Sequence, residues 1–215
     1  MRVVIVGAGS PIPTFIDRRL RCLQGLGVDL TIVLPYGKPA AFDSAKIIRQ
    51  GGWSRMTPID VVRFSLTLIF SARAVSKLLA LKKSLPLSAR FKWALRMLPL
   101  TRFVKPDIIH LQWISMADDL GWLKHFYKCP IVASARGSQV TVYPLTRSGY
   151  KEKIRRALAN VDYVHCVSRS IANVCSGFGI PENKIVVNYN GIDIDVFCPR
   201  SHERPTNDYL RLISV

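Results

Sequence analysis

The segment that decides the fold is VDYVHCVSRSIANVCSGFGIPENKIVVNYNGIDIDVFCP, residues 161–199. Its apolar run Tyr163–Val167 predicts a buried strand, and Ser168 is a natural cap for a helix over Arg169–Ser176. A Gly-Ile-Pro turn follows, and Ile185–Val187 then predicts another strand. This order of strand, helix and strand is typical of a parallel sheet that has helices between its strands.

The same alternation runs back to the N-terminus, where a glycine turn follows the first β-branched run. Residues 36–56 predict a long loop, with or without a short helix inside it. The chain therefore predicts an α/β fold, a Rossmann-like doubly wound parallel sheet of about six strands. Further strands are expected at Val3–Val6, Val28–Leu34, Ile108–Leu111 and Ile131–Ala135, and helices at Phe15–Leu26, Thr57–Lys83, Ser88–Leu98, Ala117–Tyr127 and Tyr150–Ala159.

Composition indicates a folded protein with a strong preference for anionic partners. The 215 residues are 49% hydrophobic, and 31 Lys and Arg against 14 Asp and Glu give a net charge of +17. Such a charge attracts nucleic acid, anionic lipid headgroups or phosphorylated small molecules. The five scattered cysteines include no Cys-x-x-Cys pair, so we expect reduced thiols in the cytoplasm rather than disulfides or a zinc site.

Neither a leader nor a membrane span is expected from the sequence. The N-terminal apolar run is too short for a signal peptide and leads directly into the glycine turn. The most apolar stretch, Val61–Leu81, is interrupted by Arg63, Arg73 and Lys77. Because a charge at bilayer depth costs several kcal/mol, we expect no span there.

The glycine turn after the first strand, Gly7–Ser10, has three readings. Gly9 and Ser10 would line a substrate cleft, or the turn would serve packing, or it would bind a dinucleotide at the start of the next helix. The dinucleotide fingerprint needs a third glycine where Ile12 stands, and an acidic residue after the second strand, where Leu34-Pro35-Tyr36 stands. The third reading is therefore the weakest.

Polar side chains gather at the ends of two later strands. His110 and Gln112 end one strand, and Arg136, Gly137 and Ser138 end the next. The carboxyl ends of parallel strands form the usual ligand crevice, so we expect these residues to face one cleft. There, His110 would donate to a hydroxyl, and Arg136 would clamp a phosphate. The alternatives are purely structural roles: a hydrogen-bonded core histidine for His110 and an arginine with a structural partner for Arg136.

Residues 61–106 form a basic block, with ten Lys or Arg and no Asp or Glu. Interleaved aromatic residues give it the composition of a segment that lies on an anionic membrane surface. A solvated face with an ordinary packed stripe and a nucleic-acid site are the alternatives, although no nucleic-acid module accompanies the charge. The candidate membrane-surface residues are Arg73, Lys77, Lys82, Lys83, Arg90, Lys92, Trp93 and Arg96.

Near the end of the chain, Asn190-Gly191 is a strong turn signal. With Asp193, Phe197 and Pro199 it forms Asn-Gly-Ile-Asp-x-x-x-Phe-x-Pro. Taken with the preceding strand and helix, this motif resembles that of glycosyltransferase family 4, retaining enzymes of the two-domain GT-B architecture. The other matching segments are Pro106–His110, Arg136–Gln139, Val167–Ser168 and Gly179–Ile185.

The resemblance implies that residues 1–198 form the acceptor-side domain, 199–208 an interdomain linker and 209–215 the first strand of a donor-binding domain. It implies sugar transfer with retention from a nucleotide-sugar to a glycan or lipid-linked acceptor, without a metal or other cofactor. Polysaccharide synthesis at the cytoplasmic face of the membrane would suit the basic block. Gly9 and Ser10 would line the cleft between domains, His110 and Arg136 would contact a sugar, and Ser168 and Asn190 would form its floor and hinge.

This sequence departs from the family pattern at several positions. Arg136 stands where the family has a histidine, and Gln139 where it has an aspartate; the first loop has Gly9-Ser10-Pro11 where a Gly-Gly pair is common. Arginine stays protonated and cannot act as a general base. We expect this chain by itself not to catalyse transfer. The competing hypotheses are a non-catalytic module that docks on anionic membranes and another nucleotide-sugar enzyme such as an epimerase.

Overall fold

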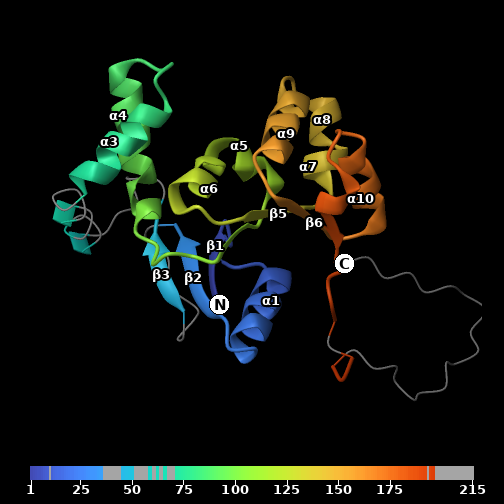
Figure 1. The fold of residues 1–215 in the computed structure, drawn as a ribbon. Coiled ribbons are helices and arrows are strands. Elements are labelled where there is room, and N and C mark those ends of the chain that lie inside the picture. The colour runs from blue at the N-terminus through green and yellow to red at the C-terminus, as the bar shows by residue number, and fades with distance from the viewer. Residues whose placement is uncertain are drawn as a thin grey trace, which may run out of the picture.

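The computed structural model describes residues 1–9, 11–35, 45–50, 58–59, 62, 65–66, 71–192 and 194–196. Within these ranges the chain forms a seven-stranded, all-parallel sheet with helices on both faces (Figure 1). The strand order is β3-β2-β1-β4-β5-β6-β7, which confirms the predicted doubly wound α/β fold. The strands are β1 (Arg2–Val6), β2 (Asp29–Leu34), β3 (Lys46–Arg49), β4 (Ile108–Leu111), β5 (Ile131–Ala135), β6 (Tyr163–Cys166) and β7 (Ile185–Val187).

The two faces of the sheet carry different helices. Helix α1 (Thr14–Gly25) lies on one face, and the helices that follow β4 and β5 lie on the other (Figure 1). The remaining helices are α3 (Ala72–Leu81), α4 (Leu87–Met97), α5 (Ala117–Leu120), α6 (Trp122–Tyr127), α7 (Ser138–Thr141), α8 (Tyr143–Thr146), α9 (Tyr150–Ala159) and α10 (Arg169–Ser176), with short 3-10 turns at η2 (Leu98–Thr101), η3 (Ile114–Met116) and η4 (Glu182–Lys184).

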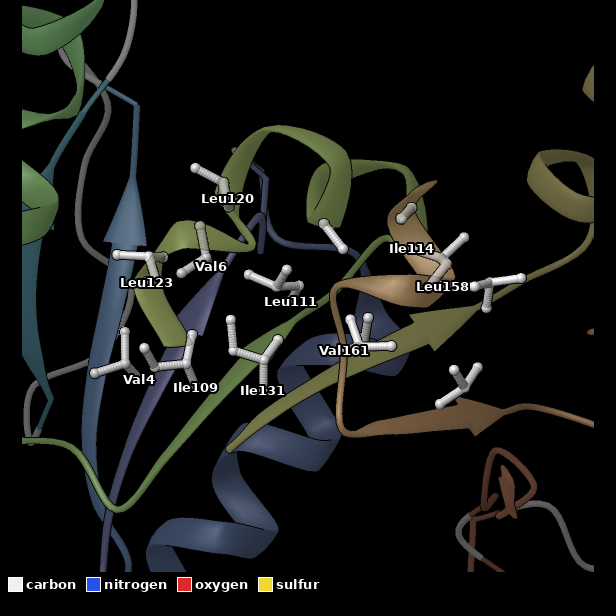
Figure 2. Close-up of a cluster of buried hydrophobic side chains, with 14 of the residues drawn as sticks. Val4, Val6, Ile109, Leu111, Ile114, Leu120, Leu123, Ile131, Leu158 and Val161 are labelled. Atoms are coloured by element: carbon white, nitrogen blue, oxygen red, sulfur yellow. The ribbon is translucent and has the colours of Figure 1, made fainter. Parts of the chain in front are cut away.

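Side-chain alternation along the strands divides the core into two clusters. On β1, Val3 and Ile5 pack with Ile16 and Leu20 of α1. Their neighbours on β1 point the other way, into a larger cluster beneath the other helices (Figure 2). Because both faces of the central strands are buried, their sequences are almost continuously apolar, which is why they were predictable.

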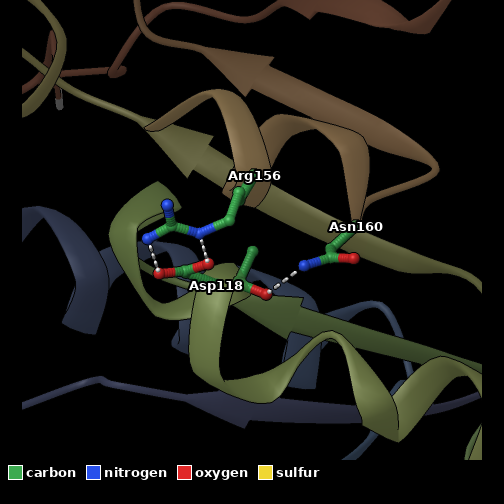
Figure 3. A network of polar contacts seen from close by, with 4 residues as sticks. Asp118, Arg156 and Asn160 are labelled. Carbon is green, nitrogen blue, oxygen red and sulfur yellow. Dashed lines mark hydrogen bonds and ion pairs between the residues drawn. The ribbon is translucent and has the colours of Figure 1, made fainter. Parts of the chain in front are cut away.

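A polar contact joins two of the helices on the larger cluster. Arg156 on α9 donates from Nε and Nη2 to the two carboxylate oxygens of Asp118 on α5, at 2.8 and 2.9 Å. The Asn160 side chain donates to the Ala117 carbonyl at 3.3 Å (Figure 3). The arginine holds the pKa of the Asp118 carboxyl below its usual value. These contacts fix α9 over the turn that follows β4, close to the ends of the strands.

Some predicted elements differ from the observed ones. The loop prediction for 36–56 is wrong at Lys46–Arg49, where four residues form β3 and pair with β2. Such a short edge strand gives no readable periodicity. The helix predicted at Ala117–Tyr127 is divided at Gly121 into α5 and α6. Of the helix predicted at Thr57–Lys83, the part over Ala72–Leu81 is α3, and most of the preceding residues lie outside the described ranges.

Several predictions fall where the structure gives no description. The proposed linker at 199–208 and the proposed strand at 209–215 both lie outside the described residues, as does Ser10. Among the helices that are described, none is both long enough and apolar enough to cross a bilayer.

Candidate functional site

The segments that follow β1 and β4 are held together by an indole ring. Trp113 donates from Nε1 to the Gly7 carbonyl at 2.8 Å, and its ring meets Phe15 of α1 edge-on at 6.5 Å. Gly7 has φ +85°, and a Cβ added there would lie 2.5 Å from the sulfur of Met116. The backbone conformation therefore favours glycine at this position, and any side chain there would also require Met116 to move.

Arg136 follows β5 directly and is held between these two rings. Its guanidinium carbon lies 4.5 Å from the ring centre of Phe15 and 5.9 Å from that of Trp113. The residue is only 8% exposed, and its Nε and Nη2 have no hydrogen-bond partner among the described residues. Burial, and then the positive charge of Arg19, lower the pKa of Arg136 to about 10. The arginine therefore stays charged at neutral pH.

A pocket of about 640 Å³ opens beside Arg136, at the carboxyl ends of the strands. This volume falls in the range of roughly 300–1,000 Å³ that is usual for small-molecule sites. Four residues predicted from sequence meet here: Arg136, Gly137, Ser138 and Asn190. The rest of the lining comprises Phe15, Trp113, Ser115, Met116, Gln139, Tyr143 and Val167.

Arg19 of α1 adds a second positive charge near the pocket. Its Nη2 donates to the Asn190 side-chain oxygen at 3.3 Å, and burial lowers its pKa. Its charge also lowers the pKa of Arg136. No described carboxylate offsets these effects on the two arginines. The pocket is therefore positively charged on the side where α1 and the end of β5 approach each other.

A hydrogen-bonded chain crosses the sheet on the α1 face, through β4, β5 and β6. His110 Nε2 and Ser134 Oγ are 2.9 Å apart, as are Ser134 Oγ and His165 Nδ1. His165 Nε2 lies 2.9 Å from the Asn188 carbonyl, and the Gln112 side-chain nitrogen lies 3.4 Å from His110 Nδ1. Since the Asn188 carbonyl can only accept, His165 donates from Nε2, and a consistent chain makes Ser134 and then His110 donors in turn. We name the side chains of His110, Ser134 and His165 the polar ladder.

Both histidines of the polar ladder are neutral at neutral pH. Burial is the main cause, and it lowers the pKa of His110 to about 3 and that of His165 to about 4. The positive charges of Arg19 and Arg136 act in the same direction. For His165, the hydrogen bond to the Asn188 carbonyl opposes the shift in part. At neutral pH neither imidazole carries a positive charge, so neither can act as an imidazolium acid toward a substrate.

The remaining predicted residues take other positions. His110 and Gln112 do not line the pocket, since His110 is bonded within the polar ladder and Gln112 is fully buried. Ser168 caps α10, as expected, and accepts from the Ile171 amide at 3.2 Å. Gly9 has φ +85° in the loop after β1, and Gly191 is exposed beside Asn190.

The residues that sequence reasoning missed are the ring partners of Arg136, the tyrosine of the pocket wall, and Ser134 and His165 of the polar ladder. Ser134 and His165 stand in strand positions like that of His110, and that position was a usable signal. Phe15 carried no such signal because it is far from Arg136 in the chain and shares no motif with it. No group of three or more metal-binding side chains lies close together in the described part of the chain.

The basic block has two kinds of side chain. Most of its candidate residues lie on the surface of α3 and α4 or the turn between them: Arg73, Lys77, Lys83, Lys92 and Arg96 are exposed. Trp93, however, packs against Trp122 at 6.0 Å, and Lys82 lies 5.6 Å from the Trp93 ring. Arg90 donates twice to the Leu79 carbonyl at the end of α3. Arg90 thus ties α4 to α3, and Trp93 packs α4 against α6.

The sequence matches the family described as Glycosyltransferase Family 4 over residues 12–196. The chain belongs to glycosyltransferase family 4. The match spans the pocket, the polar ladder and the basic block. A comparison with curated proteins finds no match for the sequence.

Solved structures with the same fold include GT-B glycosyltransferases. Anabaena Alr3699/HepE, in complex with UDP-glucose, has a TM-score of 0.51 at 12% identity, over 92% of this chain and 46% of that one. The lipopolysaccharide outer core galactosyltransferase WaaB, in its apo form, has 0.52 at 12% identity, over 95% and 50%. Arabidopsis thaliana UGT89C1, complexed with UDP-L-rhamnose, has 0.51 at 8% identity, over 86% and 48%. This chain therefore spans about half the length of these proteins.

Proposed function

We propose that this family 4 chain is the acceptor-binding half of a retaining glycosyltransferase, which moves a sugar from a nucleotide-sugar to a glycan or lipid-linked acceptor. The observation that carries the proposal is the pocket beside Arg136, at the strand ends where open α/β sheets bind ligands. Two of the similar solved structures contain UDP-glucose or UDP-L-rhamnose, which supports a nucleotide-sugar as the donor.

In this proposal, the pocket holds the acceptor sugar and a second domain supplies the donor site. Ser138, Gln139 and Asn190 offer hydroxyl and amide groups to sugar hydroxyls, and Tyr143 offers an apolar wall. Transfer proceeds with retention and without a metal or other cofactor. The division at residues 198 and 208 is part of the same proposal.

The test is transfer activity of the full-length gene product against a panel of nucleotide-sugars, with the 215-residue chain as control. We expect transfer by the longer protein, unchanged by EDTA, with retained anomeric configuration by NMR, and no transfer by the 215-residue chain alone. Hydrolysis or epimerisation of the nucleotide-sugar in place of transfer would contradict the proposal, and so would activity that EDTA abolishes.

We also propose that the hairpin of α3 and α4 binds the anionic surface of the inner membrane face. Its exposed basic residues are accompanied by exposed apolar side chains in the first part of α4, of which Leu87 is 71% exposed and Phe91 46%. Basic residues with neighbouring exposed apolar groups are typical of interfacial binding.

A further inference from the structure

The arrangement of Arg136 differs from that of an arginine with a structural role. A structural arginine at 8% exposure is normally paired, because a buried charge without partners is costly. Here Nε and Nη2, the two nitrogens on one edge of the guanidinium, have no partner among the described residues. The aromatic faces of Phe15 and Trp113 fix the plane of the group and leave this edge without a bond.

The Nε–Nη2 edge of a guanidinium matches two oxygens of a carboxylate or phosphate, to which it donates two parallel hydrogen bonds. The pocket supplies the space for such a group, since Arg136 is part of its lining. Arg19 lies close enough to lower the pKa of Arg136 and adds attraction for an anion. Its contact with Asn190 places this second charge beside another lining residue.

We propose that Arg136, with Arg19 behind Asn190, makes this pocket a binding site for an oxyanion, a carboxylate or phosphate group carried by the substrate. That the anion belongs to a substrate rests on the proposed function, whereas the anion site itself does not. Two sources share this chemistry: an acid group on the acceptor sugar, and the phosphates of the donor nucleotide. The neutral hydroxyls of an uncharged sugar satisfy the arginine less well, because only an anion adds opposite charge and presents two acceptor oxygens that match the edge of the guanidinium.

The test is isothermal titration calorimetry of the 215-residue chain with four probes: glucuronate, glucose 6-phosphate, glucose and UDP. We expect at least one anionic probe to bind more tightly than glucose. Arg136→Met should weaken that binding by about tenfold or more, since the lost hydrogen bonds are to a charged group. The matched control is Arg155→Met, an exposed arginine on α9 that pairs with Glu152 at 2.7 Å. It removes the same charge and should leave the affinity unchanged.

The arms also identify the source of the anion. Preference for glucuronate or glucose 6-phosphate over UDP assigns the site to the acceptor, and preference for UDP assigns it to the donor phosphates. Equal affinity of glucose and the anions overturns the proposal. Equal losses in Arg136→Met and Arg155→Met also overturn it, because they would reflect only the net charge of +17.

A second variant keeps the test valid if Arg136→Met does not fold, which circular dichroism would show. Arg19→Gln leaves the aromatic contacts of Arg136 in place and should weaken anion binding a few-fold, because it removes one nearby positive charge. Arg136→Lys keeps the charge but lacks the paired donors of the guanidinium, so it should also weaken anion binding. No loss in either Arg19→Gln or Arg136→Lys would overturn the proposal. Binding is measured without transfer, so a negative transfer assay leaves this result standing, and a negative titration leaves the transfer test intact.

Discussion

At the scale of single residues, Arg136 shows how a binding group and a stable core make opposite demands. The side chain is almost fully buried, and among the described residues two of its nitrogens have no partner. Contact with the faces of Phe15 and Trp113 offsets part of the cost of burying the charge. The remainder is a local loss of stability of the kind that binding sites often carry.

We therefore expect Arg136→Met to raise the free energy of unfolding by about 1 kcal/mol, because methionine fills the same space without a buried charge. Urea denaturation followed by circular dichroism measures this change, with Arg155→Met as the control that should stay within about 0.5 kcal/mol of the parent. A destabilised Arg136→Met protein would mean that the guanidinium contributes to packing more than its burial costs.

Gly7 provides a second prediction at this scale. We expect Gly7→Ala to destabilise the fold by about 2 kcal/mol or more, because alanine is strained at φ +85° and its Cβ would lie 2.5 Å from the Met116 sulfur. Gly25 at the end of α1 has open space around it and no positive φ, so Gly25→Ala should be neutral or slightly stabilising. The two melting temperatures can be compared directly, and equal values would argue against a constrained first loop.

At the scale of elements, the polar ladder connects three strands to the segment that carries Asn190. His165 holds the Asn188 carbonyl, and Asn190 follows two residues later with its contact to Arg19. The ladder lies on the α1 face, whereas the apolar residues that alternate with it point into the larger cluster. His165, in the sheet, thus helps to position Asn190, a pocket residue that follows the last strand.

The neutral histidines of the polar ladder predict a loss of stability in mild acid. The unfolded chain takes up protons as the pH falls below about 6.5, whereas the folded pKa values are about 3 and about 4. The stabilising effect of the two neutral histidines is therefore fully present above about pH 6.5. As the pH is lowered from there toward 4, the free energy of unfolding falls by at least about 2 kcal/mol. Urea titrations at pH 7.0, 5.5 and 4.5 measure this slope.

The control for this effect is the exposed His125 on α6. His165→Gln should reduce the change in stability between pH 7.0 and 4.5, and His125→Gln should not. If the slope is the same in the parent and in His165→Gln, the ladder is not its source.

Much of this element-level picture could be predicted from sequence, for reasons specific to the residues. Val3–Val6 and Ile131–Ala135 are apolar runs bounded by turns, and buried parallel strands have that composition. Ser168 was predictable as a cap because a serine directly before a helix commonly accepts a hydrogen bond from a backbone amide of the first turn. At Lys46–Arg49 the strand is four residues long and lies at a sheet edge, so its formation depends on pairing with β2 rather than on local preference.

The candidate site was only partly predictable, for a different reason. Arg136 and Asn190 could be selected because charged or amide side chains at strand ends and turns indicate ligands. The partners that define the pocket come from distant parts of the chain: Phe15 is on α1, and Trp113 follows β4. The role of His110 as a partly buried hydrogen-bonding group depends on its facing Ser134 across the sheet, which the linear sequence does not specify.

At the scale of the whole molecule, part of the charge of +17 is gathered at two places, the pocket and the surface of the hairpin of α3 and α4. Arg136 and Arg19 lie near the strand ends. The exposed lysines and arginines of the second group are on α3 and α4, the helices at the β3 edge of the fold (Figure 1). The two groups therefore predict two separable anion-dependent activities, one for a small ligand and one for an extended surface.

The surface can be tested with vesicles that contain phosphatidylserine. We expect Lys83→Gln/Lys92→Gln to weaken vesicle binding roughly 30-fold at low salt, at about 1 kcal/mol for each basic residue near the surface. The matched control is Lys128→Gln/Lys151→Gln, which removes two exposed charges elsewhere. Binding that persists in high salt, or an equal loss in the control, would exclude a specific membrane role for the hairpin.

The placement of Trp113 also gives the protein a natural optical reporter. Its indole lies in the pocket wall, 5.9 Å from the Arg136 guanidinium, while Trp93 and Trp122 contact each other beneath the hairpin. An incoming ligand changes the surroundings of Trp113 and leaves those of Trp93 and Trp122 unaltered; the fourth tryptophan, Trp53, lies outside the described residues. Intrinsic fluorescence can thus follow occupancy of the pocket without any attached dye.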